Sequence, residues 1–478
     1  MPPECGKRSL LTAPRGCRGW RFSAPPETFD AAARANLRRP LRTKIFPLAA
    51  QNDTAVADRA SFAGVKRGEW PALILAFVYF FLVLAAYYVL RPVREQLAAA
   101  SGSQVLFEFY LTTFIVTLIL TPVYGWLVAR FPRKRFVPVV YLFFIVNLLA
   151  FIPAFEAQGQ LNPRALGLVF FVWLSVFNLF VVAVFWSFIA DIFSADQSYR
   201  LFGIIALGGT LGAIAGPLLT KWLVHVIGIG PLLGVSAALL AGAVACVLAL
   251  VAWSRRHPVA KDVQRNETVI GGDFWGGAKL VFGSPFLRRI ALLVLLGDSV
   301  GGVLYNLQTD IGHQYYPDGA ARTDFFASVD FATNALMALT QIFITRFALM
   351  RFGPARSVSA TELVKFLTLV TLALIGQPAA VAAALIVTRA GSYGINNPAI
   401  DSLFTRVDRE TRYKAKGFVD TAVWRFGDVA VVGVLSLLRD FGYAAPSFFA
   451  ALGALASISA AWIAWRLRST PELTQQNR

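Results

Sequence analysis

The stretch from Arg406 to Asp428 combines charged side chains with the start of an apolar helix. It begins as a polar, cationic segment and carries charge on into a run of apolar residues. Lys416, Asp420, Trp424 and Asp428 recur every four residues, which places them on one slowly drifting helical face. Arg425 lies three residues before Asp428, close enough to pair with it. Such a face is either a seam of ion pairs between helices or a binding surface for an anionic solute, and both interpretations stay open.

Further charged residues interrupt other apolar segments. An ionisable group inside a membrane span costs several kcal/mol unless it is paired or lines a wet cavity. Arg91 and Arg94 are three residues apart and share a helical face, and Arg389 lies in a later apolar segment. Because arginine holds phosphate or carboxylate through paired hydrogen bonds, we predict that these three bind the solute. Asp298 is a candidate for coupling to a proton or cation, or else a partner for an arginine.

The elements that must position these residues are membrane-spanning helices. The chain has 478 residues, of which 56% are hydrophobic and only 15% are charged. An apolar run of about 20 residues suffices to cross a bilayer, and the uncharged runs 165–190 and 231–253 are longer. No alternating pattern of the kind that forms barrel strands is present. The sequence therefore predicts an all-α membrane protein.

Twelve transmembrane helices are predicted, in two six-helix pseudo-repeats separated by the longest polar loop. The predicted spans are 71–91, 105–127, 136–156, 166–190, 201–226, 231–253, 287–308, 325–347, 357–376, 379–400, 417–438 and 444–466. The predicted domains are a disordered basic cytoplasmic tail (1–70), the first six-helix bundle (71–253), a cytoplasmic linker (254–286), the second bundle (287–466) and a cytoplasmic tail (467–478).

The charge distribution predicts the orientation. A net charge of +18 would suggest a nucleic-acid partner in a soluble protein. Here the surplus lies in the N-terminal tail and in the loops after even-numbered spans. Positive-inside bias explains that pattern, so no nucleic-acid partner is predicted. The same bias predicts that both termini are cytoplasmic. The expected location is a bacterial inner membrane.

No residue pattern supports an enzyme. There is no phosphate-binding loop of the P-loop type and no set of nucleophile, base and acid. The cysteines Cys5, Cys17 and Cys246 have no metal-like spacing. We therefore predict no catalytic residue, no metal and no cofactor.

Two basic loops indicate that the halves are related. ARFPRKR follows the second predicted span and MRFGPAR follows the eighth, so Arg130 and Arg135 correspond to Arg351 and Arg356. Parallel halves around a central site are a transporter architecture, and the alternative is a chance recurrence of a basic loop. We expect these arginines to contact helix C-termini and carboxylates on the inner face, which would hold one conformation.

The fifth span reads GGTLGAIAGPLLT. Gly208, Gly212 and Gly216 stand four residues apart and predict a smooth groove in which a partner helix approaches closely. Pro217 is expected to bend the helix. This element is interpreted as structural, whether it serves ordinary helix packing or a conformational change.

These motifs resemble the major facilitator superfamily. Its loop between spans 2 and 3 carries a glycine and a basic cluster in the layout of GWLVARFPRKR, and the Gly-x-x-x-Gly-Pro element resembles the fifth-helix motif of its exchangers. The resemblance implies twelve helices in two halves that rock to expose a central site alternately to each side of the membrane. In this architecture spans 1, 4, 7 and 10 line the central cavity.

A narrower resemblance is to the ATP/ADP translocases. Their first-helix signature is matched by Tyr87, Leu90, Arg91, Arg94 and Glu95. A second pattern, Lys-x-Lys, then Asp, then Arg-x-Gly, is matched by Lys414, Lys416, Asp420, Arg425 and Gly427. The resemblance implies that Lys414, Lys416, Asp420 and Arg425 help to bind an anionic solute, with ATP and ADP as candidates.

Three functions are consistent with these observations. The first is a secondary active transporter that exchanges an organic anion such as a nucleotide. The second is a proton-coupled exporter of drug-like or metabolite solutes, in which Asp298 titrates. The third is a membrane protein that has a transporter-like fold but transports nothing. The expected partners are membrane lipid and the small solute, and the expected state is a monomer.

Overall fold

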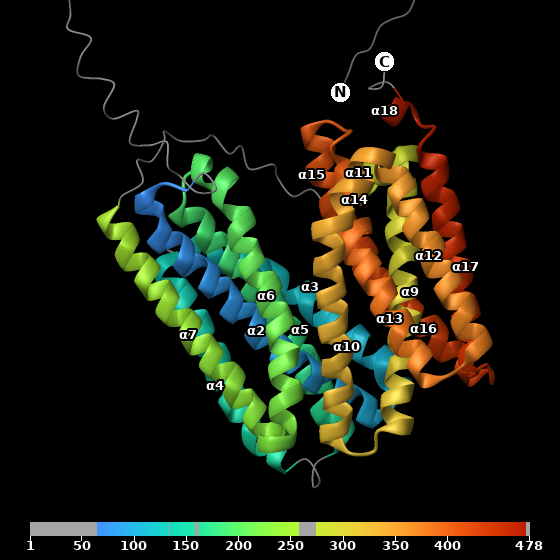
Figure 1. Ribbon diagram of the computed structural model, residues 1–478, viewed down its shortest axis with the longest axis horizontal. Coiled ribbons are helices and arrows are strands. Elements are labelled where there is room, and N and C mark those ends of the chain that lie inside the picture. Colours follow the sequence, from blue (N-terminus) through green and yellow to red (C-terminus); the bar gives the residue numbers. More distant parts are fainter. Residues whose placement is uncertain (1–64, 132, 158–161, 258–273, 475–478) are drawn as a thin grey trace, which may run out of the picture. The chain divides into compact units, whose positions relative to one another are not determined.

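The computed structural model describes residues 65–131, 133–157, 162–257 and 274–474, which belong to one compact unit, residues 61–478. Within the described ranges the chain is helical and has no strand (Figure 1). Twelve helices there are long and apolar enough to cross a membrane. The prediction of an all-α protein with twelve spans is therefore confirmed. Most of the predicted N-terminal tail and the middle of the predicted linker lie outside the described residues.

Six spans form each half of the chain. The first half contains α2 (Trp70–Ser101), α3 (Leu106–Arg130), α4 (Arg133–Glu156), α5 (Pro163–Ile192), α6 (Ala195–Ile227) and α7 (Ile229–Arg256). The second half contains α9 (Pro285–Tyr315), α10 (Gly319–Leu339) with α11 (Arg346–Phe352), α12 (Pro354–Ile375), α13 (Pro378–Gly391) with α14 (Asn397–Phe404), α15 (Arg409–Phe418) with α16 (Trp424–Asp440), and α17 (Pro446–Leu467). The short helices are α8 (Phe274–Gly283), inside the predicted linker, and α18 (Pro471–Thr474), in the predicted C-terminal tail.

Several helices continue past the predicted ends of their spans. The first span was predicted to end at Arg91, but α2 runs to Ser101. The seventh was predicted to end at residue 308, but α9 runs to Tyr315. Charged residues limit an apolar window in the sequence, whereas a helix continues through them when neighbouring helices supply partners. Arg91 and Arg94 therefore lie inside a helix and not at its edge.

Local sequence explains where helices begin and turn. Proline occupies the first turn of α5, α9, α12, α13 and α17, where its missing N–H costs no hydrogen bond. The Asn162 side chain accepts a hydrogen bond from the backbone N–H of Arg164 and caps α5. Gly353 separates α11 from α12 at φ 77°, a conformation that favours glycine.

Three spans of the second half contain a π-helical turn within the described residues. The turns are Thr340–Thr345, Ser392–Asn396 and Val419–Val423. The first two are joined by a hydrogen bond of 2.7 Å from Thr345 Oγ1 to the Gly394 carbonyl. The third lies inside the eleventh span, Glu410–Asp440, between Lys416 and Asp428 of the predicted face. Turns of this kind are frequent at functional sites.

Each half has its own apolar core. The largest buried cluster has its buried members between Val65 and Val251, with α2 packed against α5, α6 and α7. Two further clusters have their buried members between Val281 and Leu467. The halves meet where α10 contacts α2 and α6, where α9 contacts α2, and where α16 contacts α3. Side chains on these helices are therefore the ones that can reach across from one half to the other.

Candidate functional site

The predicted close approach of the fifth span to a partner helix is present, and the partner is α2. A Cβ atom on Gly208 or Gly212 would overlap the backbone carbonyl oxygens of Phe77 or Phe81, and one on Gly216 would lie 2.7 Å from the Ala85 carbonyl oxygen. The glycines of α6 thus let it lie directly on the backbone of α2. This contact fixes the helix that carries Arg91 and Arg94.

Arg91 forms an ion pair between the two halves. Its Nη1 atom donates a hydrogen bond of 2.8 Å to Oδ1 of Asp330, on α10. Nη1 of Arg389, on α13, lies 3.8 Å from the same oxygen. Asp330 is buried, and the arginine side chains are only 14% and 16% exposed. One carboxylate therefore holds two arginines that come from different halves.

Arg94 belongs to the same cluster through Glu95. Arg94 Nη2 lies 2.6 Å from Glu95 Oε1, and Arg91 Nε lies 3.8 Å from that oxygen. The other Glu95 oxygen accepts a hydrogen bond from the hydroxyl of Tyr305, on α9. The Arg94 guanidinium lies over the Phe171 ring, 4.6 Å from its centre. Arg94 is thus mostly buried, between a carboxylate and an aromatic ring.

The charges of this cluster do not balance. Within ion-pairing distance, the three guanidinium groups of Arg91, Arg94 and Arg389 face the two carboxylates of Glu95 and Asp330, an excess of one positive charge. Asp428 also interacts with Arg94, from beyond ion-pairing distance. Asp330 Oδ2 and Arg94 Nε are buried without a hydrogen-bond partner in the described part of the chain. An excess buried charge is costly unless something neutralises it. We call these five residues, with Tyr305, the arginine cluster.

The structure thus brings together three of the predicted binding residues and adds three others. Glu95, Tyr305 and Asp330 were not among the predicted binding residues. A charge count could have pointed to Glu95 and Asp330, because each arginine in an apolar span requires an anionic partner. The contact of Tyr305 with Glu95 arises only when α9 is packed against α2.

Lys416 and its neighbours form a separate group. Lys416 Nζ lies 2.5 Å from Asp401 Oδ1 and 3.1 Å from Asp420 Oδ2. Lys414 Nζ lies 2.5 Å from Glu410 Oε1. These side chains are partly exposed, and Asp401 is twelve residues beyond Arg389, about 18 Å along a helix. The predicted residues Lys414, Lys416 and Asp420 therefore form a seam of ion pairs away from the arginine cluster.

Arg425 and Asp298 form a third group. Arg425 Nη1 lies 3.8 Å from Asp428 Oδ2, as the spacing predicted. Asp298, on α9, interacts with both Asp428 and Arg425. Its Oδ2 atom is buried without a hydrogen-bond partner among the described residues. Asp298 is thus beside an arginine and a second carboxylate, which leaves both of its predicted roles open.

The basic loops occupy equivalent places in the two halves. Arg130 ends α3 and Arg135 lies in the first turn of α4, while Arg351 lies in the last turn of α11 and Arg356 in the first turn of α12. Arg130, Arg351 and Arg356 are exposed. Their predicted role in holding one conformation stays a prediction.

Pro217, which was expected to bend the fifth span, lies within the single helix α6.

The start of α2 is anchored by charge. The Arg200 guanidinium donates two hydrogen bonds of 3.1 Å to the Glu69 carboxylate, and Gln197 Nε2 donates a third, also 3.1 Å long. Burial acts to raise the pKa of Glu69, but the hydrogen bonds from Arg200, the Lys66 N–H and Gln197 outweigh it and hold the pKa below its ordinary 4.5. The network ties the start of α2 to the start of α6.

Polar contacts also join the halves beyond the arginine cluster. Arg439 pairs with Asp310 at 2.5 Å and donates to Ser103. The His313 ring nitrogen Nδ1 lies 2.8 Å from the Ala99 carbonyl oxygen. These contacts lie where spans 1, 7 and 11 end and span 2 begins, and in an alternating bundle those ends share one side of the membrane. The halves are therefore tied together at that side.

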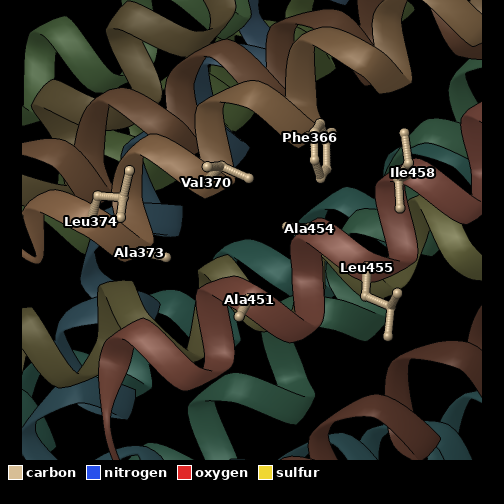
Figure 2. A pocket seen from close by; sticks show the side chains of 8 residues that line it. All are labelled: Phe366, Val370, Ala373, Leu374, Ala451, Ala454, Leu455 and Ile458. Atoms are coloured by element: carbon tan, nitrogen blue, oxygen red, sulfur yellow. The ribbon is translucent and has the colours of Figure 1, made fainter.

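A groove between α12 and α17 has a different character. Its volume is about 360 Å³, and it is lined by Phe366, Val370, Ala373, Leu374, Ala451, Ala454, Leu455 and Ile458. Figure 2 shows only hydrocarbon side chains facing it. Nothing in its lining would bind a charged or polar group.

Comparisons with known proteins agree with this fold. The sequence model of the Major Facilitator Superfamily matches residues 72–431. A bacterial homologue of the iron transporter ferroportin, in an inward-facing state, has a TM-score of 0.62 at 13% identity, over 84% of this chain and 99% of that one. The nucleoside transporter NupG has a TM-score of 0.54 at 15% identity, over 85% of this chain and 100% of that one.

A bacterial homologue of the human lysosomal transporter Spinster, inward-facing and unoccupied, gives a TM-score of 0.56 at 14% identity, over 85% of this chain and 100% of that one. No curated protein matches the sequence. The comparisons do not support the narrower resemblance to ATP/ADP translocases. Since the matched region covers residues 72–431, and thus most of the chain and eleven of its twelve spans in whole or part, this protein belongs to the Major Facilitator Superfamily.

Proposed function

We propose that the protein is a secondary active transporter that exchanges an organic anion by alternating access. The observation that carries this proposal is the arginine cluster, which lies where the two halves meet and has one more positive than negative charge. An anionic solute would neutralise that excess. Energy would come from solute gradients, because no residue pattern for hydrolysis is present in the sequence.

Arg389 is the cation best placed to receive the solute. Its 3.8 Å separation from Asp330 is longer than a hydrogen bond, so charge alone holds it there. Its planar fork of N–H groups fits a phosphate or carboxylate. Arg91 offers a second fork from the opposite half, with the Tyr88 ring 5.8 Å away from its guanidinium carbon. Phosphate and a planar base would both find partners here, so nucleotides are the first organic anions to test.

Exchange by purified protein in proteoliposomes tests this proposal. Arg91→Ala and Arg389→Ala are each expected to slow exchange of the transported anion about 100-fold, because losing a desolvated charge-assisted pair costs about 3 kcal/mol. The panel comprises ADP, phosphate, succinate and a cationic dye. Arg164→Ala is the matched control, since Arg164 is 59% exposed and pairs with Glu108 at the periphery. Unchanged exchange in folded Arg91→Ala and Arg389→Ala would refute the site, and absence of any flux would favour a non-transporting protein.

The second candidate is a proton-coupled exporter that uses Asp298. The observation in its favour is the position of Asp298 beside Asp428, since two adjacent carboxylates repel each other when both are charged. An imposed pH gradient is then expected to drive uptake of the dye into vesicles by wild-type protein. Asp298→Asn would abolish that gradient-driven uptake. A rate that is independent of the pH gradient would exclude proton coupling.

A further inference from the structure

Asp330 occupies the position that the transported anion requires. A single oxygen, Oδ1, contacts Arg91 at 2.8 Å and Arg389 at 3.8 Å, so it lies where a ligand oxygen would bridge the two arginines. The second oxygen, Oδ2, is buried and makes no hydrogen bond within the described residues. A carboxylate that was purely structural would be expected to have both oxygens satisfied. Asp330 is thus only half satisfied, although cations surround it.

We propose that Asp330 is a built-in counter-ion that the transported anion displaces, an inference that rests on the proposed function. When no anion is bound, Asp330 neutralises the charge of one arginine. It thereby lowers the free-energy cost of burying the cations. When the anion binds, its oxygens take over Arg91 and Arg389, and Asp330 is released from them. Asp330 is a positioning residue in this scheme, and it competes with the solute for the same N–H donors.

The displacement changes which helices are tied together. The ion pair of Arg91 with Asp330 connects α2 to α10. A bound anion bridging Arg91 and Arg389 would instead connect α2 to α13. Helix α10 would then be held to the first half by its other contacts, the hydrogen bond of 2.7 Å from Asn334 to Ala213 and the contacts of Lys221 with Ser328 and Asp324. Solute binding would therefore weaken the attachment of α10 to the first half.

Glu95 does not play the same part. Both of its oxygens are used, one by Arg94 and one by Tyr305. It is therefore better fixed than Asp330, and it neutralises Arg94 whether or not the solute is present. This difference between two buried carboxylates in one cluster is what singles out Asp330.

Binding of inorganic phosphate and succinate, read as a shift in melting temperature, tests the inference. The effective probe is whichever of these two anions raises the melting temperature of the wild-type protein. Asp330→Asn removes the competing charge, so the half-saturating concentration of that probe is expected to fall at least tenfold. Asp330→Glu keeps the charge and is expected to stay close to wild type. Asp324→Asn is the matched control. It removes another carboxylate of α10, whose Oδ1 atom lies 4.0 Å from Lys221 Nζ of the first half. This variant should leave the half-saturating concentration unchanged. Asp330→Ser serves in place of the asparagine variant if that variant does not purify.

Two results would contradict the counter-ion role of Asp330. If a probe stabilises wild type and Asp330→Asn at the same half-saturating concentration, the counter-ion inference is overturned and the anion site stands. If neither probe stabilises any of the proteins, the anion site is overturned and the inference with it.

The loosening of α10 has its own readout. Ala213→Cys with Asn334→Cys, in a background without the native cysteines, places two thiols across the α6–α10 contact. The effective probe is expected to slow formation of the disulfide at least threefold when Asp330 is present. It should have little effect in the Asp330→Asn background, where the ion pair is already broken. Equal slowing in both backgrounds would contradict the proposed release of Asp330.

Discussion

Glu362→Ala is expected to destabilise the protein by about 3 to 5 kcal/mol, because it leaves the ammonium group of Lys365 buried without its counter-ion. Lys365 Nζ donates a hydrogen bond of 2.7 Å to Glu362 Oε1, and the two side chains are 1% and 2% exposed. Glu362 also accepts from Asn396 at 2.6 Å and from Ser457 at 3.3 Å. This one carboxylate connects α12, the second π-helical turn and α17.

The measurement is thermal unfolding of detergent-purified protein. The double variant Glu362→Gln with Lys365→Met is the control, since it removes both charges and keeps an acceptor for Asn396. We expect the double variant to be more stable than Glu362→Ala, because the cost arises from an isolated charge and not from the loss of attraction. A double variant that is less stable than Glu362→Ala would show that packing, and not charge, dominates at this position.

Gly212→Ala is expected to reduce the yield of folded protein severely. The added methyl group would overlap the Phe81 carbonyl oxygen and lie 3.0 Å from the Ala85 backbone nitrogen, and neither backbone atom can move without moving α2. Overpacking of this kind costs about 1 to 3 kcal/mol or more. Since α2 carries Arg91, Arg94 and Glu95, a displaced α2 would also disturb the arginine cluster.

Gly203→Ala is the matched control for that variant. Gly203 lies in the same helix, α6, and a Cβ there would meet no atom within 4 Å. Alanine favours a helix over glycine by about 0.5 to 1 kcal/mol, so Gly203→Ala is expected to be neutral or slightly stabilising. Fluorescence-detected size-exclusion chromatography compares the two variants. Similar folded yields would show that α6 does not lie against α2 as closely as described.

The two substitutions together separate what glycine does in this helix. Both remove a glycine, and both raise helix propensity by the same amount. Only Gly212 faces a neighbouring backbone, so opposite results can come only from packing between α2 and α6. That packing is what the predicted groove of Gly208, Gly212 and Gly216 implied, although the sequence did not say which helix fills it.

Local patterns predicted the features that depend on local physics. The twelve spans follow from apolar runs long enough to cross a bilayer, and the structure confirms them. The pairing of Arg425 with Asp428 follows from helical spacing. The helix ends were less well predicted, because a charged residue looks like a boundary until its partner on another helix is known. Arg91 shows this most clearly.

The sequence by itself determined that this protein crosses the membrane in two related halves and that Arg91, Arg94 and Arg389 are buried cations in need of anions. Only the tertiary structure decided that Asp330 is the anion shared by Arg91 and Arg389. Asp330 is separated from Arg91 by 239 residues and Tyr305 from Glu95 by 210, so no local pattern connects them. The packing of α2 against α9 and α10 brings them into contact. The same packing keeps the arginine cluster apart from Lys416, which forms ion pairs with Asp401 and Asp420. Side-chain contacts act over a few ångströms, and the fold alone sets those distances.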